Sequence, residues 1–400
     1  MTAGLVRADG VARATPSATA PIGDVITGMV ALGHRMCAHA TSVNWVASPL
    51  SIACAFAMAR VGARGAAAGA LDEFFGYPAD GRDEAFNAIT QALVTASGPP
   101  SQRPTATPSP GAAPAPPVVA LGNALFAQQD FALQPPFLRT LAAQYGAGVR
   151  TVDFRARAAV KAINQWVSQE TAGRIPVLFN QLDESTKLVV ANTVYLRASW
   201  QSPFVRSPTT REPFARAAGG PVQVAMMHAV GSQGYAAGPG WQALSLPYAG
   251  PGTQPLAMWL LLPAPGGRPA DLLAPTTLRT VGAGLHSTPV DVAVPKWDFS
   301  TAIDLGEELP ALGLDGVFGT GDFSGIATQF DGVSAAVHRA TITVDEYGTE
   351  AAAATGLVFA TSAMQPPATT FHANRPFAFT IVGGPAHTPL FSGVVGDPGA

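Results

Sequence analysis

The sequence has few charged residues and no long apolar or basic run, and these shortages exclude several classes of protein. Charged residues make up 12% of the 400 residues and the formal net charge is −3, so no basic surface for a nucleic-acid backbone is predicted. The longest apolar stretch, Leu256 to Leu262, is far shorter than the roughly 20 residues of a membrane-spanning helix. We therefore expect neither a nucleic acid nor a membrane as a partner.

Cysteine is nearly absent. Cys37 and Cys54 are the only two, and both lie in apolar, helix-like segments, so two inert buried thiols are a better interpretation than a disulfide or a metal pair. The seven histidines are scattered without the spacing of metal ligands. No metal and no cofactor are predicted.

The motifs of common enzymes are also missing. The sequence contains no G-x-S-x-G, no H-E-x-x-H, no P-loop and no paired C-x-x-C. The segment Gly321–Gly325 (GDFSG) resembles a nucleophile loop only faintly, and a turn explains its Gly, Asp and Ser better. We therefore predict that the chain is not an enzyme, and a hydrolase remains the weakest alternative.

The composition that is present describes a well-packed globular chain. Hydrophobic residues make up 48% of the chain, which is enough for a large core. Residues 1–20 are predicted to be a disordered leader, and residues 97–117, rich in Pro, Ala and Thr, a low-complexity surface insertion. With no internal repeat, residues 21–398 are expected to form a single domain.

Helices are predicted early in the chain and strands later. Ile22 to Ala40 has helical apolar spacing, and Ser48 followed by Pro49 predicts a capped helix through Arg60. Later segments are apolar or alternating and rich in β-forming residues. They are LVVANTVYL from Leu188, QALSLPY from Gln242, LAMWLLLP from Leu256, VDVAVPKW from Val290, ATITVDEY from Ala340 and FAFTIVGG from Phe377. An α+β chain with large sheets is expected.

An unusual run of small residues, Gly348–Gly356 (GTEAAAATG), follows the predicted strand ATITVDEY. Composition alone favours a flexible linker. However, every second residue from Thr349 to Phe359 is uncharged, while Glu350 belongs to the other face. The segment can therefore also act as a strand with one buriable face.

Seven segments, in order along the chain, resemble the serpin family of serine protease inhibitors. They are NWVASPLSIACAFAMARVGARG from Asn44, LVVANTVYLRASWQSPF from Leu188, VAMMHAVG from Val224, LSLPYAG from Leu244, VHRATITVDEYGTEAAAAT from Val337, HANRPFAFTIV from His372 and LFSGVVGDP from Leu390. The chain is identified as a serpin of bacterial type. This resemblance implies three β-sheets surrounded by helices, with an exposed reactive-centre loop at about 348–370.

The resemblance also implies a function. A serine protease would cut the loop and form an acyl-enzyme, and the freed loop would insert into the central sheet as a new strand before deacylation. The implied protein is a monomeric, metastable suicide-substrate inhibitor whose partner is its target protease. A non-inhibitory serpin (chaperone, carrier or storage protein) is the alternative. The sequence shows no signal peptide, which favours the cytoplasm, whereas the family is typically extracellular, so the localisation stays open.

Family spacing locates the reactive bond. Counting fourteen positions from Gly348 reaches Ser362, and counting back from HANRPF also reaches Ser362, so the scissile bond is predicted at Ser362–Ala363. Small residues there suit subtilisin-like or elastase-like proteases, and a large apolar Phe359 favours the former. Packing of Phe359 after insertion, with no role in recognition, is the alternative interpretation of this residue. The implied recognition residues are Phe359, Ala360, Thr361 and Met364, and the implied hinge residues are Gly348, Thr349, Glu350, Ala351, Ala352, Ala353, Ala354 and Thr355.

Two further clusters follow from the resemblance. The family's "shutter", a polar cluster beneath the central sheet, corresponds to Ser48, Ser51, Asn192 and His338. The "breach", where insertion begins, corresponds to Trp200, Lys296 and Glu346. A plain surface salt bridge is the alternative interpretation of Lys296 with Glu346. The low-complexity insertion lies where some relatives carry a basic heparin-binding helix, but Arg103 is its only basic residue, so no heparin site is expected.

Overall fold

The computed structural model describes residues 3–96, 99–100, 116–205, 209–250, 255–350 and 369–400. The predicted insertion at 97–117 therefore lies almost entirely outside the described residues. Helices gather in the first half of the chain and strands in the second, as expected. The helices are α1 (Ile22–His39), α2 (Pro49–Gly62), α3 (Gly65–Phe75), α4 (Arg82–Leu93), α5 (Pro135–Thr140), α6 (Ala158–Glu170), α7 (Pro275–Gly284) and α8 (Leu305–Ala311), with helical turns η1 (Leu141–Tyr145) and η2 (Pro269–Leu273).

Helix α2 begins where the sequence predicts. The Ser48 side chain accepts a hydrogen bond from the backbone N–H of Ser51, and Pro49 occupies the first turn, where its missing N–H leaves no unsatisfied donor. The helix is buried on nearly all sides. It therefore lies in the core of the molecule, beneath the main sheet.

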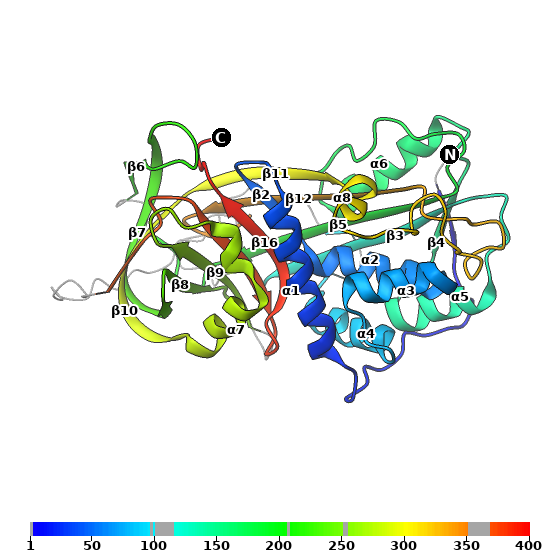
Figure 1. Ribbon diagram of the computed structural model, residues 1–400, viewed down its shortest axis with the longest axis horizontal. Coiled ribbons are helices and arrows are strands. Elements are labelled where there is room, and N and C mark those ends of the chain that lie inside the picture. Colours follow the sequence, from blue (N-terminus) through cyan, green and yellow to red (C-terminus); the bar gives the residue numbers. More distant parts are fainter. Residues whose placement is uncertain (1–2, 97–98, 101–115, 206–208, 251–254, 351–368) are drawn as a thin grey trace.

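The main sheet has seven described strands in the order β1-β4-β3-β5-β13-β12-β11. Its long strands run along the long axis of the molecule (Figure 1). β5 pairs antiparallel with β3, and part of β5 pairs parallel with β12. The bounds are β1 (Gly4–Val6), β4 (Val149–Val152), β3 (Val118–Gln128), β5 (Leu188–Ser199), β13 (Gly348–Thr349), β12 (Ala335–Asp345) and β11 (Trp297–Asp304).

This sheet is buried on both faces. The large core lies on the side of α1 to α4, whereas α6 covers the other side over a smaller core that includes Phe126, Ile163 and Trp166 (Figure 1). Every residue of β5 except Arg197 is buried, which explains why its sequence is a continuous apolar run rather than an alternating one.

The remaining strands form a continuous nine-stranded sheet. Its order is β14-β10-β7-β8-β9-β15-β16-β2, with β6 paired to β7. The 17-residue strand β7 pairs with β6 and β10 along most of its length and with β8 at its end, so it joins two of the three expected sheets into one. The bounds are β2 (Trp45–Ala47), β6 (Thr210–Phe214), β7 (Val222–Gly238), β8 (Trp241–Pro247), β9 (Leu256–Pro263), β10 (His286–Pro295), β14 (Thr369–His372), β15 (Phe377–Gly383) and β16 (Thr388–Val395).

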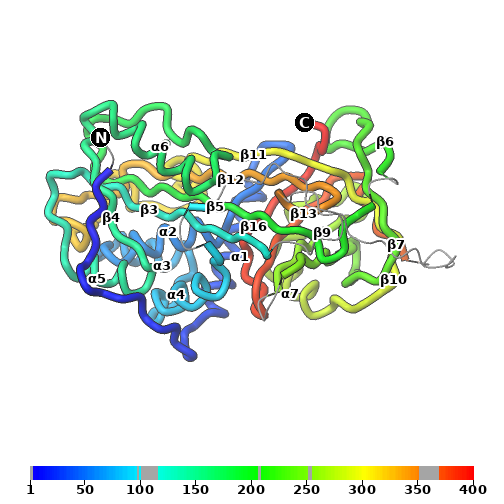
Figure 2. The backbone as a smooth tube through the Cα atoms, turned by 180° about the vertical axis from the view of Figure 1, so that it is seen from behind, coloured from blue at the N-terminus to red at the C-terminus, as the bar shows by residue number. Residues whose placement is uncertain are grey.

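Residues 3–20 are ordered against the rest of the chain, and the prediction of a disordered leader is wrong for them. β1 adds to the edge of the main sheet by pairing antiparallel with β4, and the segment then runs along the outside of the molecule towards α4 (Figure 2). The Arg13 side chain donates to Asn87 Oδ1 over 2.9 Å, and Asn87 Nδ2 donates to the Ala14 carbonyl over 2.9 Å. Backbone pairing and these polar contacts order the leader, although its composition provides no core of its own.

Candidate functional site

The predicted hinge begins inside the main sheet. Gly348 and Thr349 form β13, which pairs antiparallel with β5 on one side and with β12 on the other. A Cβ on Gly348 would lie 2.1 Å from the Ala198 carbonyl oxygen, so only glycine fits between the strands at this point. The first two residues of the predicted loop at 348–370 are therefore already part of the main sheet.

Thr349 is buried, with 2% of its surface exposed. Its hydroxyl oxygen lies 2.6 Å from the Tyr248 hydroxyl oxygen, at hydrogen-bond distance. The Tyr248 ring stacks on Trp200 with ring centroids 4.6 Å apart. Burial raises the pKa of Tyr248, so its hydroxyl stays protonated and able to donate. No sequence pattern indicates a role for Tyr248, because only the folded sheet places it under the hinge.

Glu350 points away from Thr349, as alternation predicts. Its Oε1 lies 2.6 Å from the Nε atom of Arg174, and its exposed fraction is only 6%. Its backbone has a φ of 50°, in the left-handed region that non-glycine residues rarely adopt. Glu350 is thus the last described residue of the predicted hinge, and its ion pair with Arg174 fixes its position. Arg174 was not predicted, because it lies far away in the sequence.

The rest of the predicted loop lies outside the described residues. This holds for the hinge residues after Glu350, for the recognition residues and for the reactive bond, which are Ala351, Ala352, Ala353, Ala354, Thr355, Phe359, Ala360, Thr361, Ser362, Ala363 and Met364. The strand after the loop, β14, begins at Thr369.

The three predicted breach residues lie together at the end of the main sheet where β13 enters. Lys296 Nζ lies 2.9 Å from Glu346 Oε2, and Thr209 donates to the other carboxylate oxygen over 3.1 Å. Trp200 donates through its indole N–H to the Asp345 carbonyl over 3.0 Å. Glu346 is only 3% exposed, so its ion pair is not a plain surface salt bridge.

The Glu346 carboxyl stays charged in this position. Burial alone would raise its pKa, but the hydrogen bonds from Lys296, from the backbone and from Thr209 outweigh burial, so the pKa is lowered. The Lys296–Glu346 ion pair therefore links the residues just before the hinge to the residue that precedes β11.

The four predicted shutter residues form one buried hydrogen-bond network beneath the sheet. The Ser48 N–H donates to His338 Nε2 over 3.0 Å, and His338 Nδ1 contacts Asn192 Oδ1. Because Nε2 accepts, the neutral ring carries its proton on Nδ1 and donates it to Asn192. Asn192 Nδ2 donates to the Ser51 hydroxyl over 2.7 Å.

The network has a fifth member that the sequence analysis missed. Asn123 on β3 accepts through Oδ1 from Asn192 Nδ2 over 2.7 Å and from the Ser51 hydroxyl over 3.2 Å. It links β3, β5 and α2. No spacing in the sequence distinguishes it from other strand residues, because its role follows from the pairing of Asn123 opposite Asn192.

Acid should weaken the fold through His338. Burial lowers the pKa of His338 to about 3, against 6.5 in the unfolded chain. The unfolded chain therefore takes up a proton near pH 6.5 while the folded protein does not. The stability that the neutral ring contributes is present above pH 6.5 and is lost as the pH falls towards 3, at up to about 1.4 kcal/mol per pH unit. We expect His338→Gln to reduce the slope of the free energy of unfolding against pH, measured by urea unfolding at pH 7, 6, 5 and 4.

The exposed His286 provides a matched control, since His286→Gln removes a histidine without changing the network. The control should keep the slope of the original protein. An equal slope in the original protein and His338→Gln would contradict the assignment.

The described part of the chain holds no group of three or more His, Cys, Asp or Glu side chains that could bind a metal. No helix within it is long and apolar enough to cross a membrane. Cys37 and Cys54 are both free and buried, and burial raises each thiol pKa to about 12, so the prediction of inert thiols is confirmed.

Comparison with known proteins decides the family. The family model described as "Serpin (serine protease inhibitor)" matches residues 29–398. The chain belongs to the serpin family. This serpin is 32% identical over 360 residues to an uncharacterized serpin-like protein of Thermococcus kodakarensis, covering 88% of this chain and 80% of the relative. It is 32% identical over 377 residues to the leukocyte elastase inhibitor of Bos taurus, covering 90% of this chain and 94% of the relative.

The fold agrees with the family. The structure matches that of a thermophilic serpin, Tengpin, in the native state with a TM-score of 0.84 at 21% identity, over 99% of this chain and 100% of that chain. The predicted serpin fold is thereby confirmed. Serpins are protease inhibitors rather than enzymes.

Proposed function

We propose that this serpin is an irreversible suicide-substrate inhibitor of serine proteases. The observation that carries the proposal is the position of β13, because the chain leading to the reactive loop already lies between β5 and β12. A cleaved loop would continue the same strand towards the other end of the sheet. The relatives named as elastase inhibitors support inhibition as the activity, and the assignment to a bacterial type stays a prediction.

The two central strands would have to separate further. Among the described residues, β5 and β12 pair directly only through Val189–Thr193 and Ala335–Arg339, at the end far from β13. This closed segment contains the opposed pair Asn192 and His338. The shutter network therefore lies where the inserting loop has to part the strands, and its hydrogen bonds would break and re-form during insertion.

The covalent step follows serine protease chemistry. The protease serine attacks the Ser362 carbonyl carbon, an ester forms between the two, and the Ser362–Ala363 peptide bond breaks with its nitrogen leaving as the new amino terminus of Ala363. Insertion of residues 350–361 as a strand would then carry the esterified protease along the sheet before water reaches the ester. The protease would be trapped because its active site is distorted.

The target class follows from the loop sequence. Ser362 is small and uncharged, so we do not expect cleavage there by proteases whose substrate pocket selects a cationic or bulky side chain. Phe359, three residues before Ser362, favours subtilisin-like enzymes, and the likeness to leukocyte elastase inhibitors favours elastase-like ones. We propose both as targets, recognised through Phe359 to Met364, with the protein acting as a monomer that needs no cofactor or heparin.

A protease panel tests this function. Incubation with a subtilisin-like and an elastase-like enzyme should give a band at the summed mass that survives boiling in detergent. Sequencing of the released carboxyl-terminal peptide should begin at Ala363. Complete cleavage by both enzyme types without any such band would contradict inhibition.

A single substitution tests the position of the bond. Ser362→Arg should transfer complex formation to trypsin-like enzymes, because a cationic side chain pairs with the acid at the base of their pocket. Thr361→Arg places the same charge one residue away and serves as the control. Equal behaviour of the two variants would show that the reactive bond lies elsewhere.

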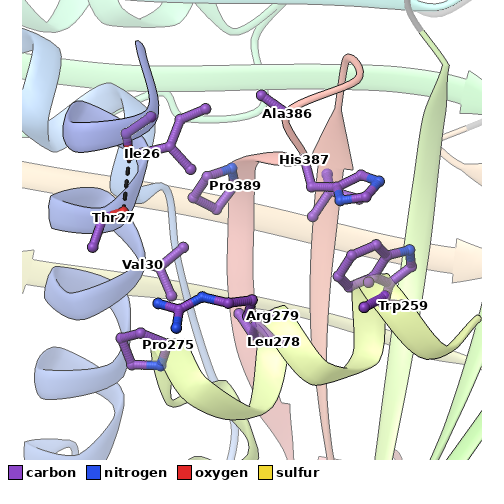
Figure 3. Close-up of a pocket in the computed structure, with 14 residues that line it drawn as sticks. Ile26, Thr27, Val30, Trp259, Pro275, Leu278, Arg279, Ala386, His387 and Pro389 are labelled. Carbon is purple, nitrogen blue, oxygen red and sulfur yellow. Dashed lines mark hydrogen bonds between the residues drawn. The ribbon is translucent and has the colours of Figure 1, made fainter. Parts of the chain in front are cut away.

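A second candidate function is carriage of a small apolar acid, and one cavity favours it. The cavity of about 440 Å³ lies between α1, α7 and the β9, β15 and β16 strands, and its walls are mostly apolar. Figure 3 shows Arg279 extending from α7 towards α1, with Trp259 and His387 on the other side of the cavity. The Trp259 and His387 rings lie 4.8 Å apart, and burial lowers the pKa of His387. Arg279 is the charged group available to an acidic ligand.

Anilinonaphthalenesulfonate, an aromatic anion, is a suitable probe of this cavity. We expect saturable one-to-one fluorescence enhancement that Arg279→Ala weakens about tenfold, with the exposed Arg157→Ala as a control. A carrier would bind the probe and give no covalent protease complex, whereas identical titrations of all three proteins would reject the site.

A further inference from the structure

A second cavity, of about 350 Å³, lies beneath the N-terminal segment and is not used by inhibition. The floor is formed by α2, α4 and β3, and one wall is formed by β4 with the chain that precedes it. The outer wall includes Leu5, Arg7 and Arg13 from the ordered leader. Part of this site therefore exists only because residues 3–20 pack on the edge of the sheet.

Three arginines line this cavity, and their hydrogen-bond partners are uncharged. Arg7 donates to the Gly146 carbonyl, and Arg13 donates to Asn87 Oδ1 and Thr90 Oγ1. The Arg150 guanidinium lies 5.6 Å from the centre of the Trp166 ring, in a cation–π contact. In the part of the chain that the structure describes, none of the three forms a salt bridge with a carboxylate.

The cavity is consequently positive. Its one acidic lining residue is Glu170, against three arginines, and the other titratable groups on its surface are the Cys54 thiol and the Tyr145 hydroxyl. Burial lowers the pKa of Arg13 and of Arg150, and it raises the pKa of Glu170. The Glu170 carboxylate attracts Arg150 and offsets part of its charge. One carboxylate among three guanidinium groups leaves an excess of positive charge on partly desolvated side chains, and an anion in the cavity would offset it.

The remaining lining is apolar and includes Leu5, Met58, Val94, Leu121 and Trp166. A bare ion would leave this surface in contact with water. A ligand that combines an oxyanion with a small hydrocarbon or aromatic part would cover both kinds of surface.

We propose that this cavity binds a small organic phosphate, whose oxyanion is held by Arg13 and Arg150 and covered by Arg7. Planar guanidinium groups match phosphate oxygens with two parallel hydrogen bonds, which is why arginine is preferred at such sites. Inorganic phosphate shares this chemistry and is distinguished from an organic phosphate by experiment.

The site is connected to the shutter. Asn123 lines the cavity and also accepts hydrogen bonds from Asn192 and Ser51 in the network beneath the sheet. A ligand that contacts the leader, β3 and β4 at once binds the folded form and not the unfolded chain, and so it raises the melting temperature. Organic phosphate would thereby restrain the native sheet from opening.

Isothermal titration of the full chain with phenyl phosphate, inorganic phosphate and phenol at constant ionic strength tests the proposal. Phenyl phosphate should bind at one site with a Kd below about 1 mM, and phenol should not bind. At 10 mM phenyl phosphate the melting temperature should rise by roughly 2 °C or more. Tighter binding of phenyl phosphate than of inorganic phosphate would support an organic phosphate as the ligand. Equal affinity for the two would overturn that proposal in favour of the free ion.

Variants locate the site. Arg13→Gln and Arg150→Gln should each weaken phenyl phosphate binding at least tenfold, while Arg139→Gln, an exposed arginine on α5, should not change it. Arg150→Lys keeps the charge and should weaken binding less than Arg150→Gln, which provides a readout if Arg13→Gln fails to fold. Equal affinity in all these proteins, or no binding to the original protein, would overturn the proposal. No protease is involved, so the outcome is independent of the inhibitor test.

Discussion

Thr349→Arg should convert this serpin from an inhibitor into a substrate of the same protease. Thr349 is already buried between β5 and β12, where its hydroxyl meets Tyr248 over the stacked Trp200 ring. A guanidinium buried at this position without a partner would cost several kcal/mol, so we expect the substituted hinge to leave the sheet in the uncut protein and to require burial again during insertion. Each 1.36 kcal/mol added to the insertion barrier slows insertion tenfold, so deacylation would win. The stoichiometry of inhibition should rise at least tenfold.

The isosteric Thr349→Val is the matched control. It keeps the size of the side chain and removes only the hydroxyl, so it should inhibit near one-to-one although Tyr248 loses a partner. Both variants should be cut at the same bond at a similar first rate, because the residues from Phe359 to Ala363 are unchanged. Near one-to-one inhibition by Thr349→Arg would show that insertion does not pass through this position.

Cleavage of the loop should raise the melting temperature by about 10 °C or more. Among the described residues of the uncut protein, the strand between β5 and β12 comprises Gly348 and Thr349 alone. A fully inserted loop would add on the order of ten backbone hydrogen bonds at roughly 1 kcal/mol each. Since 1 kcal/mol corresponds to roughly 1–2 °C in a domain of nearly 400 residues, these hydrogen bonds alone give a rise of about 10–20 °C.

Calorimetry before and after cutting near Ser362 with a non-target protease measures this shift. Cut Thr349→Arg is the informative comparison, because its obstructed strand should give a much smaller rise than the cut original protein. An unchanged melting temperature after clean cutting would mean that the loop does not insert.

Much of the fold can be predicted from the sequence because local signals agree with it. The Ser48 cap, the apolar run of β5 and the alternation in β12 each match the observed elements. That the leader, residues 3–20, packs against the rest of the chain could not be predicted. Its three-residue strand, Gly4–Val6, is stabilised by the edge of β4, and so short a run gives no sign of the edge that it will meet.

The candidate site, like the fold, was predictable from the sequence only in part. The family resemblance predicted that His338 and Asn192 lie close together. In the structure the two side chains are in contact within one hydrogen-bond network. Tyr248, Arg174 and Asn123 could not be found in this way. Each lies more than fifty positions from its partner in the chain, and its contact depends on strand register and on the path of the chain after α6.

The burial of β15 and β16 decides how a cut molecule would behave during handling. β15 pairs with β9 on one side and β16 on the other, and all its residues are buried. A fragment starting at Ala363 would therefore stay attached without any covalent link, and the cut protein would elute from a sizing column as one particle. A purification tag at the carboxyl terminus would retrieve the cut protein intact, yet after boiling it would mark only a short peptide. A tag at the amino terminus would remain on the fragment that ends at Ser362 and carries the trapped protease.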